Sequence, residues 1–355
     1  MSTWSGNKLK VQIFGSSHAP KMGVNLINFP HEEIDFDQLN CFLNRRKPTY
    51  SPTFGGKTPF TTRVEEDKLN ILSGISDNTI CQEEVSVTID NLNVRKTDYD
   101  NLYAKPRPSH ADYACYLKDG RLDFSGGGEF SGRMTAPFCV AGGIAKQFLN
   151  RRGVSVNAYV YKVGNVCGLS YKSCDTSKLN RQQIFPSLSN GENMLKAIMD
   201  AKNDGDSIGG VIECVIDGFP GGIGGELFDG LEGKLANIIY SIPGVKGVEF
   251  GLGFGFADTL GSKANDQIKN VNGKIVTVKN DSGGINGGIS NGMQITLSVA
   301  FRPTPSIGKP QNTVDLLTGE NVQIQISGRY DACFVPRAVP VVESAVCIAL
   351  LDSVL

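Results

Sequence analysis

The chain has 355 residues, 40% hydrophobic and 20% charged, so it is long enough to bury a sizeable core and has the composition of an ordinary soluble protein. Its formal net charge of −1 gives no electrostatic reason to expect nucleic acid or an anionic membrane surface as a partner. No apolar run approaches the ~18 residues that span a bilayer, and the N-terminus lacks the apolar core of a signal peptide.

Hydrophobic periodicity predicts strands and helices mixed along the whole chain. Strands are expected at Lys10–Phe14, Val85–Ile89, Val154–Val163, Gly210–Ile216, Lys274–Lys279 and Met293–Phe301. Helices are expected at Phe36–Arg46, Met134–Leu149, Glu192–Asn203, Leu227–Tyr240 and Ala338–Leu351. Because strands often follow strands directly, an α+β arrangement with antiparallel sheets is favoured over a doubly wound parallel sheet.

A faint internal repeat accompanies these elements. Val24–Pro30 and Val215–Pro220 share an apolar-polar pattern ending in Phe-Pro, and each leads into a predicted helix. The repeat is a hint of a duplicated fold with its site between the two halves.

The nine cysteines are scattered singly, without a CxxC pair. This pattern argues against a zinc site and against a disulfide framework, and no other metal site is expected. It predicts reduced thiols in a cytoplasmic protein.

Glycines gather in three clusters, at 126–128, 221–225 and 283–288. Glycine lets the backbone approach a ligand closely, and a glycine loop that opens a helix directs free N–H groups at an anion. Turns use the same residues, however, and none of the clusters fits a dinucleotide fingerprint or a P-loop.

Two of the three histidines, His18 and His110, lie in short runs of small and polar residues. Such loop histidines suit acid-base catalysis, although satisfied structural histidines are the plain alternative. Arg107 precedes His110 by three residues, and Arg329 precedes Asp331 by two. Arginines beside candidate acids and bases favour a phosphate or carboxylate ligand.

Several ordered motifs resemble those of one family, the chorismate synthases, over nearly the whole chain. They are Gly15-Ser16-Ser17-His18-Ala19, Arg107-Pro108-Ser109-His110-Ala111-Asp112, residues 126–135, Gly205-Asp206-Ser207-Ile208-Gly209, Arg302-Pro303-Thr304-Pro305-Ser306-Ile307 and Gly328-Arg329-Tyr330-Asp331-Ala332-Cys333.

The resemblance implies a single domain over residues 1–355, a β-α-β sandwich with helices between two antiparallel sheets and an internal pseudo-twofold. It also implies a homotetramer. The implied activity is that of a lyase: trans-1,4 elimination of phosphate from 5-enolpyruvylshikimate 3-phosphate to give chorismate. Reduced FMN is needed without net redox change, and NADPH only if the protein reduces its own flavin.

The resemblance also assigns residues. His110 matches the acid at the leaving phosphate, His18 a histidine that protonates the flavin, and Asp331 the aspartate near flavin N5. Substrate contacts carry over to Ser17, Arg46, Lys57, Arg107, Ser131, Gly132, Arg133 and Arg329. Cofactor contacts carry over to Glu129, Phe130, Ser131, Pro243, Gly244, Gly287, Arg302, Pro303, Thr304, Pro305, Ser306 and Arg329.

The chain departs from the family pattern in the glycine motif. Glu129 stands where the family has a basic residue, and Phe130 where it has serine. A buried carboxylate beside an anionic cofactor is costly unless it is protonated or turned outward, so weaker flavin binding is expected if Glu129 faces the site. A non-catalytic or diverted paralogue that binds flavin or a shikimate-like phosphate is the alternative function.

Overall fold

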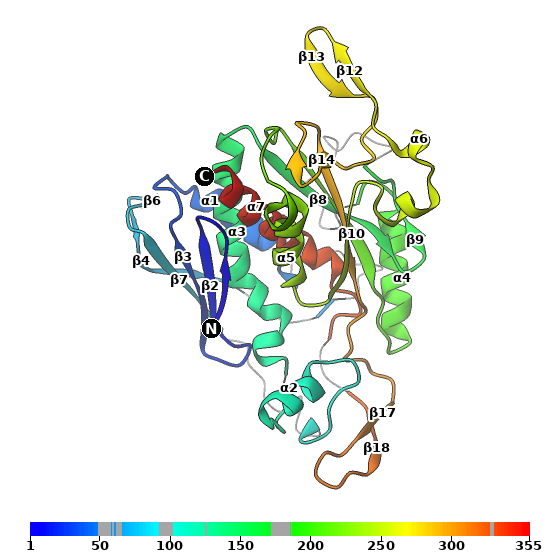
Figure 1. Ribbon diagram of the computed structural model, residues 1–355. Helices are drawn as coiled ribbons and strands as arrows, with labels where there is room; N and C mark the ends of the chain where they lie inside the picture. The colour runs from blue at the N-terminus through cyan, green and yellow to red at the C-terminus, as the bar shows by residue number, and fades with distance from the viewer. Residues whose placement is uncertain are drawn as a thin grey trace.

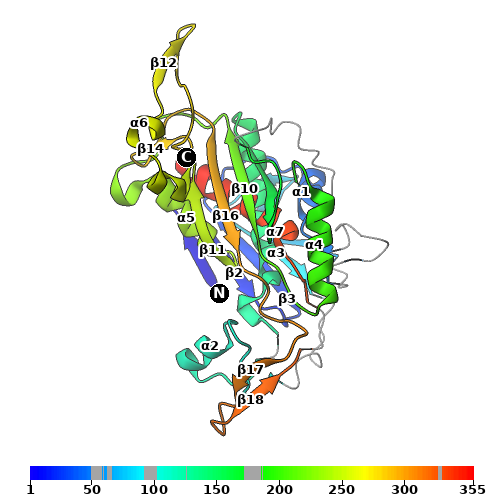
Figure 2. The same cartoon turned by 90° about the vertical axis from the view of Figure 1, so that its right-hand side faces the viewer.

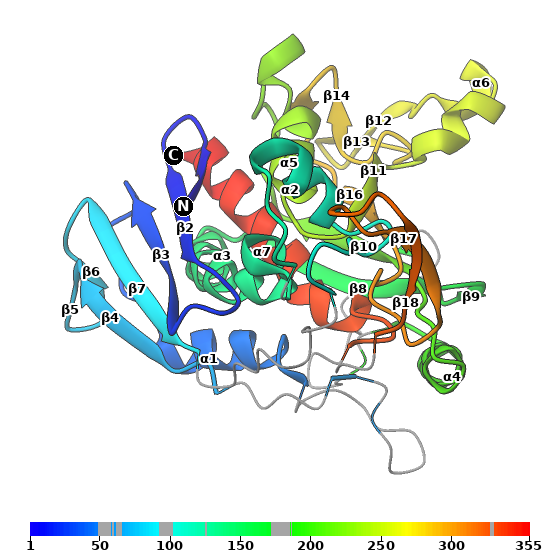
Figure 3. The ribbon, with the colours of Figure 1, turned by 90° about the horizontal axis from the view of Figure 1, so that it is seen from below.

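The computed structural model describes residues 1–48, 58, 60–61, 66–91, 102–124, 126–171, 185, 187–326 and 330–355 (Figure 1). Two five-stranded antiparallel sheets enclose a layer of helices, which Figure 3 shows edge-on. The predicted α+β sandwich is confirmed.

The first sheet is built from the N-terminal part of the chain. Its strands lie in the order β1 (Ser2–Ser5), β2 (Lys10–Gly15), β3 (Lys21–Ile27), β7 (Glu84–Asp90) and β4 (Leu69–Ser73). Alternate residues such as Val24, Leu26, Val85 and Val87 are buried on the face that meets the helices. The period of two therefore gives this sheet one apolar face.

The second sheet is built from the remaining long strands. Their order is β11 (Val245–Phe250), β16 (Ile295–Phe301), β10 (Gly210–Asp217), β8 (Ser155–Val163) and β9 (Val166–Cys167). Like β3 in the first sheet, β10 is the central strand. The segments of the faint repeat, Val24–Pro30 and Val215–Pro220, thus contain the ends of β3 and β10. This correspondence between the two central strands is in keeping with a duplicated fold.

Two long helices fill the space between the sheets. Helix α3 (Thr135–Arg151) packs against the first sheet, and α7 (Val335–Val354) packs against the second sheet and against α3. Both are buried on all sides over most of their length, because their sequences are apolar all round. A β-carbon on Gly142 of α3 would lie 2.1 Å from that of Ser344 in α7, so only glycine permits this close crossing.

The helix layer also contains α1 (Phe36–Asn44), which packs on α3, and α5 (Leu231–Tyr240), which packs on α7. A buried ion cluster ties these parts together. Glu343 of α7 accepts hydrogen bonds from Arg45 at 2.8 and 3.0 Å, from Lys146 at 2.8 Å and from the backbone N–H of Ala158 at 3.0 Å. Four donors satisfy the carboxylate that burial would otherwise penalise.

The remaining elements decorate the sandwich. Helix α4 (Gly191–Asn203) packs beside β8 and β9 at one edge of the second sheet (Figure 3). The hairpin of β12 (Ile268–Val271) and β13 (Lys274–Thr277) projects from one end, while α2 (Asp112–Asp119) lies at the other (Figures 1 and 2). The short elements are β5 (Ile75–Ser76), β6 (Thr79–Ile80), η3 (Gly128–Phe130), η4 (Gly132–Met134), η6 (Leu227–Asp229), η7 (Gly253–Asp258), α6 (Gly261–Ala264), β14 (Ile285–Asn286), β15 (Ile289–Ser290), β17 (Gln311–Val314) and β18 (Asn321–Ile324).

The helix predicted at Leu227–Tyr240 is wrong at its start. Leu227 has a positive φ of 51° and Phe228 is 98% exposed, and these residues form the separate turn η6. Helix α5 begins only at Leu231, whose N–H donates to the carbonyl oxygen of Gly288. The apolar spacing continued into the turn, but its side chains face solvent rather than the core.

Candidate active site

A cavity of about 260 Å³ opens where α3 and α7 begin and α1 and α5 end. Its lining residues come from seven segments that are distant in sequence. They are Arg46, Thr61, Arg107, His110, Gly127, Phe130, Ser131, Gly132, Arg133, Thr135, Ile242, Pro243, Gly244, Arg302, Thr304, Pro305, Ser306, Tyr330, Asp331, Phe334, Arg337, Ala338 and Val341. Most of the residues predicted for substrate and cofactor therefore meet at one place.

The backbone makes this cavity favourable for anions. Thr135 begins α3, and Phe334 precedes the first residue of α7. Both helices direct their N-terminal ends, with their partial positive charge, toward the cavity. Among the described residues, five arginines line the same space, namely Arg46, Arg107, Arg133, Arg302 and Arg337, against a single lining carboxylate, that of Asp331.

Arg107 and His110 are joined by Asp112. The guanidinium of Arg107 donates to Asp112 from Nε at 2.7 Å and from Nη2 at 2.9 Å, and also reaches the carbonyl oxygen of Gly126 at 2.6 Å. Nδ1 of His110 lies 2.5 Å from Oδ1 of Asp112. The contacts of His110 within the described chain use Nδ1, which leaves Nε2 for a ligand.

Arg46 and Arg133 share another buried carboxylate. Oδ2 of Asp67 lies 2.8 Å from Nη2 of Arg46, and Oδ1 lies 2.5 Å from Nη1 of Arg133. All three side chains are less than a tenth exposed. Asp67 holds two arginines of the lining side by side, and an anion approaching both would meet a pair of cations already oriented.

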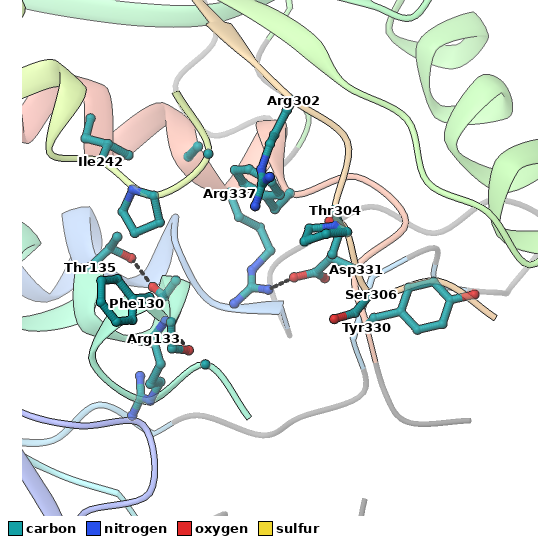
Figure 4. Close-up of a pocket in the computed structure, with 18 of the residues that line it drawn as sticks. Phe130, Arg133, Thr135, Ile242, Arg302, Thr304, Ser306, Tyr330, Asp331 and Arg337 are labelled. Atoms are coloured by element: carbon teal, nitrogen blue, oxygen red, sulfur yellow. Dashed lines mark hydrogen bonds and ion pairs between the residues drawn. The ribbon is translucent and has the colours of Figure 1, made fainter. Parts of the chain in front are cut away.

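Asp331 is held by two donors. Its Oδ1 accepts the backbone N–H of Thr61 at 2.8 Å, and its Oδ2 accepts Nη1 of Arg337. Figure 4 shows Arg337 in the middle of the cavity, between Phe130 on one side and Asp331 on the other, with Arg302 entering from a different segment. Among the residues that the structure describes, Arg337, six residues later in the chain, is a cation that contacts Asp331.

Part of the cavity lining is apolar, as the binding of a planar ring would require. These residues are Phe130, Ile242, Pro243, Phe334 and Val341. Thr61 and Thr304 also line the cavity, and their buried hydroxyls have no hydrogen-bond partner within the described residues. Buried hydroxyls normally find partners, so these two indicate a polar ligand. Together with the arginines, this donor set fits a flavin that carries a phosphate.

His18 and Ser17 lie behind the glycine loop rather than on the cavity surface. A β-carbon on Gly126 would come within 2.0 Å of Nε2 of His18, and Gly126 has a φ of +70°. The backbone N–H of Ser17 donates to the carbonyl oxygen of Gly128 at 3.1 Å. Glycine at 126 therefore lets the imidazole pack against the loop whose neighbours line the cavity.

Glu129 is turned away from the cavity. Its carboxylate lies 2.9 Å from Nη2 of Arg121, and its side chain is 50% exposed. The hydrogen bond from Arg121 lowers the pKa of Glu129 below its usual value. The expectation that this carboxylate stands beside an anionic cofactor finds no support in the geometry.

Gly287 lies far from the cavity that the same chain forms. The hairpin of β14 and β15 contacts the first residue of α5, whereas Pro243 and Gly244 follow the last. A helix of ten residues separates the two positions by about 15 Å. Pro303 lies between two lining residues without lining the cavity itself, and Lys57 and Arg329 fall outside the described residues.

Sequence reasoning missed Asp67 and Arg337, and gave Asp112 no role of its own. Asp67 lies in a run of charged residues that looks like an exposed loop. Arg337 lies in the first turn of α7, just before the residues predicted as that helix. Asp112 could have been found, because it follows His110 by two residues at a predicted site.

Comparison with known proteins shows the family of this chain. A model of the family described as chorismate synthase matches residues 9–355. The chain belongs to the chorismate synthase family. It is 40% identical over 356 residues to a chorismate synthase of Dehalococcoides mccartyi, covering 99% of this chain and 96% of that protein. It is 39% identical to one of Thermococcus kodakarensis over 352 residues, covering 99% of this chain and 97% of the relative.

A solved structure of a chorismate synthase shares the fold. The TM-score is 0.74 at 24% sequence identity, and the match covers 98% of this chain and 92% of the other. Within the described residues, no helix is both long and apolar enough to cross a membrane.

Proposed function

We propose that this chain is a working chorismate synthase, which converts 5-enolpyruvylshikimate 3-phosphate into chorismate by trans-1,4 elimination of phosphate. The observation that carries the proposal is the meeting of His110, Asp331 and five arginines around one cavity whose lining is partly apolar. The substrate carries a phosphate and two carboxylates, and this cavity offers cations for several anionic groups at once.

The elimination breaks a C–O bond to phosphate and a C–H bond at the other end of the conjugated system. The C–H electron pair forms one new double bond, the existing double bond shifts toward the carbon that loses phosphate, and phosphate leaves with the C–O pair, so there is no net oxidation. Arg107 and the protonated His110 would stabilise the charge that grows on the leaving phosphate, with a proton passing from Nε2 to a phosphate oxygen.

Reduced FMN, when bound, would supply an electron-rich ring that assists removal of the substrate proton. The residues that would hold it are Phe130, Pro243, Gly244, Arg302 and Thr304, which supply apolar surface, a cation and a hydroxyl without a partner among the described residues. Asp331 is the carboxylate of the lining that could accept a proton, and Thr61 and Arg337 fix both of its oxygens.

The direct test is turnover of 5-enolpyruvylshikimate 3-phosphate with photoreduced FMN under anaerobic conditions, followed as phosphate release and chorismate formation. Turnover that requires the flavin supports the proposal. Absence of turnover, with substrate and flavin still bound, would favour the non-catalytic paralogue. A parallel assay with oxidised FMN and NADPH shows whether the protein reduces its own flavin.

We also propose that the chain assembles as a homotetramer through the end that carries the β12–β13 hairpin. Elements β12, β13, α6 and β14 lie together at that end (Figures 1 and 2). Large apolar side chains there are mostly exposed, including Phe254, Leu260, Ile268 and Ile275. Exposed apolar patches of this kind mark protein interfaces. Light scattering after size exclusion should give four copies, and Ile268→Asp with Ile275→Asp should reduce that number.

We place the protein in the cytoplasm. The eight cysteines among the described residues are all free thiols, five of them buried. Unpaired thiols are typical of a reducing compartment. Fractionation of cells that produce the untagged protein would check the location.

A further inference from the structure

Asp112 is a buried carboxylate that contacts the candidate acid but does not line the cavity. It is the first residue of α2, and it is 4% exposed. Its Oδ1 meets Nδ1 of His110, while its Oδ2 accepts the backbone N–H of Arg107 at 3.0 Å and Nε at 2.7 Å. Burial raises the pKa of Asp112, but the hydrogen bonds from His110 and Arg107 outweigh it and lower the pKa to about 2. The carboxylate is therefore ionised at neutral pH.

An ionised carboxylate has no proton to donate, so the short contact is a hydrogen bond only if Nδ1 of His110 carries the proton. One neighbour suggests the opposite tautomer, because Nη2 of Arg107 lies 3.2 Å from Nδ1 and could donate to it. Nη2 of Arg107 has two closer acceptors, however, which are the carbonyl oxygen of Gly126 at 2.6 Å and Oδ1 of Asp112 at 2.9 Å. The shorter bonds to oxygen decide between the two tautomers, and the proton belongs on Nδ1.

We propose that Asp112 is a positioning residue, which fixes the orientation and tautomer of His110 so that Nε2 faces the ligand. The inference deepens the proposed function and rests on it for the role of His110. When the imidazolium gives its Nε2 proton to the leaving phosphate, the product is the neutral Nδ1–H form. Asp112 binds that form without any rearrangement, so the same contact serves before and after the transfer.

A purely structural role for Asp112 would involve the same partners. Its bonds to Arg107 close the loop before α2, and its charge at the start of that helix is favourable on its own. The two roles differ in what they predict for the ring of His110. If Asp112 only stabilises the loop, it does not select which ring nitrogen of His110 carries the proton. If Asp112 is a positioning residue, it selects Nδ1.

The tautomer can be measured directly in the wild-type protein. With only histidine labelled by 13C and 15N, solid-state NMR at about pH 8.5, where an ordinary imidazole with a pKa near 6.5 is neutral, shows which ring nitrogen is protonated. The chain has three histidines, and His110→Ala assigns the signal. We expect His110 to be protonated at Nδ1. Protonation at Nε2 would overturn the proposal, whatever the activity of the enzyme.

The variant Asp112→Asn tests whether Asp112 is what sets the tautomer of His110. Arg107 donates twice to Oδ2, which holds the amide oxygen on that side and turns the NH2 group toward His110. Nδ1 must then accept, so the proton moves to Nε2. We expect the NMR signal to change to the Nε2–H form and kcat to fall by about 10²-fold or more, since an amide in such a position has cost an analogous enzyme ~10⁴ in kcat.

The control is Asp119→Asn, at the last residue of the same helix. Asp119 pairs with Arg121 at 3.1 Å and is largely exposed, outside the cavity. This variant should keep the Nδ1–H tautomer and wild-type kcat. KM of Asp112→Asn should stay within about threefold of wild type, because Arg107 keeps its bond to Gly126 and a lost transition-state contact acts on kcat.

Failure of this inference and failure of the proposed function give different results. If the wild-type protein has no turnover but carries the Nδ1–H tautomer, which Asp112→Asn changes, then the proposed reaction is wrong and the positioning role stands. If turnover is present and Asp112→Asn retains both the Nδ1–H form and at least half of wild-type kcat, Asp112 only stabilises the loop before α2.

Discussion

Replacing Asp331 by Asn separates its observed contact with Arg337 from its proposed role as a base. The carboxylate accepts the N–H of Thr61 at one oxygen and the guanidinium of Arg337 at the other. The amide of Asn has one acceptor oxygen, so its NH2 group must face one of these two donors. The substitution therefore removes a hydrogen bond as well as a charge, despite its equal size.

The contacts of Asp331 indicate how much stability and how much kcat the substitution should cost. The side chains of Asp331 and Arg337 are 15% and 12% exposed, so solvent screens their interaction only weakly. A hydrogen bond to a charged group contributes about 1.5–3 kcal/mol, and we expect a loss of stability in that range. Loss of a general base costs about 10²- to 10⁴-fold in rate, and we expect kcat to fall accordingly while KM changes little.

The assay is a double-mutant cycle with Arg337→Gln, measured both by turnover and by denaturant unfolding. If Asp331 acts only by holding Arg337, Asp331→Asn will cost nothing further in the Arg337→Gln background. If it also acts on the substrate proton, kcat will fall at least another tenfold in that background. Full turnover in Asp331→Asn, with only the stability loss, would refute the role of Asp331 as a base.

Three other substitutions test separate parts of the structure. His110→Ala should lower turnover by about 10²-fold or more with little loss of stability, because Asp112 keeps its bonds to arginine; full activity would remove the imidazole from the mechanism. Glu129→Arg should tighten reduced-FMN binding by less than about 1 kcal/mol, and less still at high salt, because the carboxylate already faces Arg121 in solvent; an anaerobic titration showing a change above tenfold would place it at the flavin. Glu343→Gln should cost about 3–5 kcal/mol of unfolding free energy, because it leaves the buried Lys146 and the partly buried Arg45 without their carboxylate. Burial raises the pKa of Glu343, but its cationic partners hold it well below 4.5, so wild-type stability from this group is full above about pH 4.5 and declines as the pH falls below it; unfolding curves of the variant should lack that part of the acid dependence.

Much of the fold could be predicted because periodicity is a local property. The strands of residues 154–163 and 210–216 and the helix of 134–149 were confirmed to within a residue or two. The start of α5 was wrong because Leu227 and Phe228 are apolar yet exposed, and only the packing of the whole molecule determines which apolar residues are covered. The order of strands in the two sheets could not be predicted, since pairing joins segments such as β3 and β7 that are some sixty residues apart.

The sequence by itself determined the family, the candidate acid and the basic character of the site, because motifs such as residues 107–112 keep their groups within a few residues of one another. Only the tertiary structure decided how those groups are paired. Asp67 reaches Arg133 across 66 positions of the chain, and Asp331 bonds to Arg337 in the first turn of α7. The carboxylate of Glu129 pairs with Arg121 and does not line the cavity. Side-chain direction and long-range contact depend on how the sheets and helices pack, which no local pattern encodes.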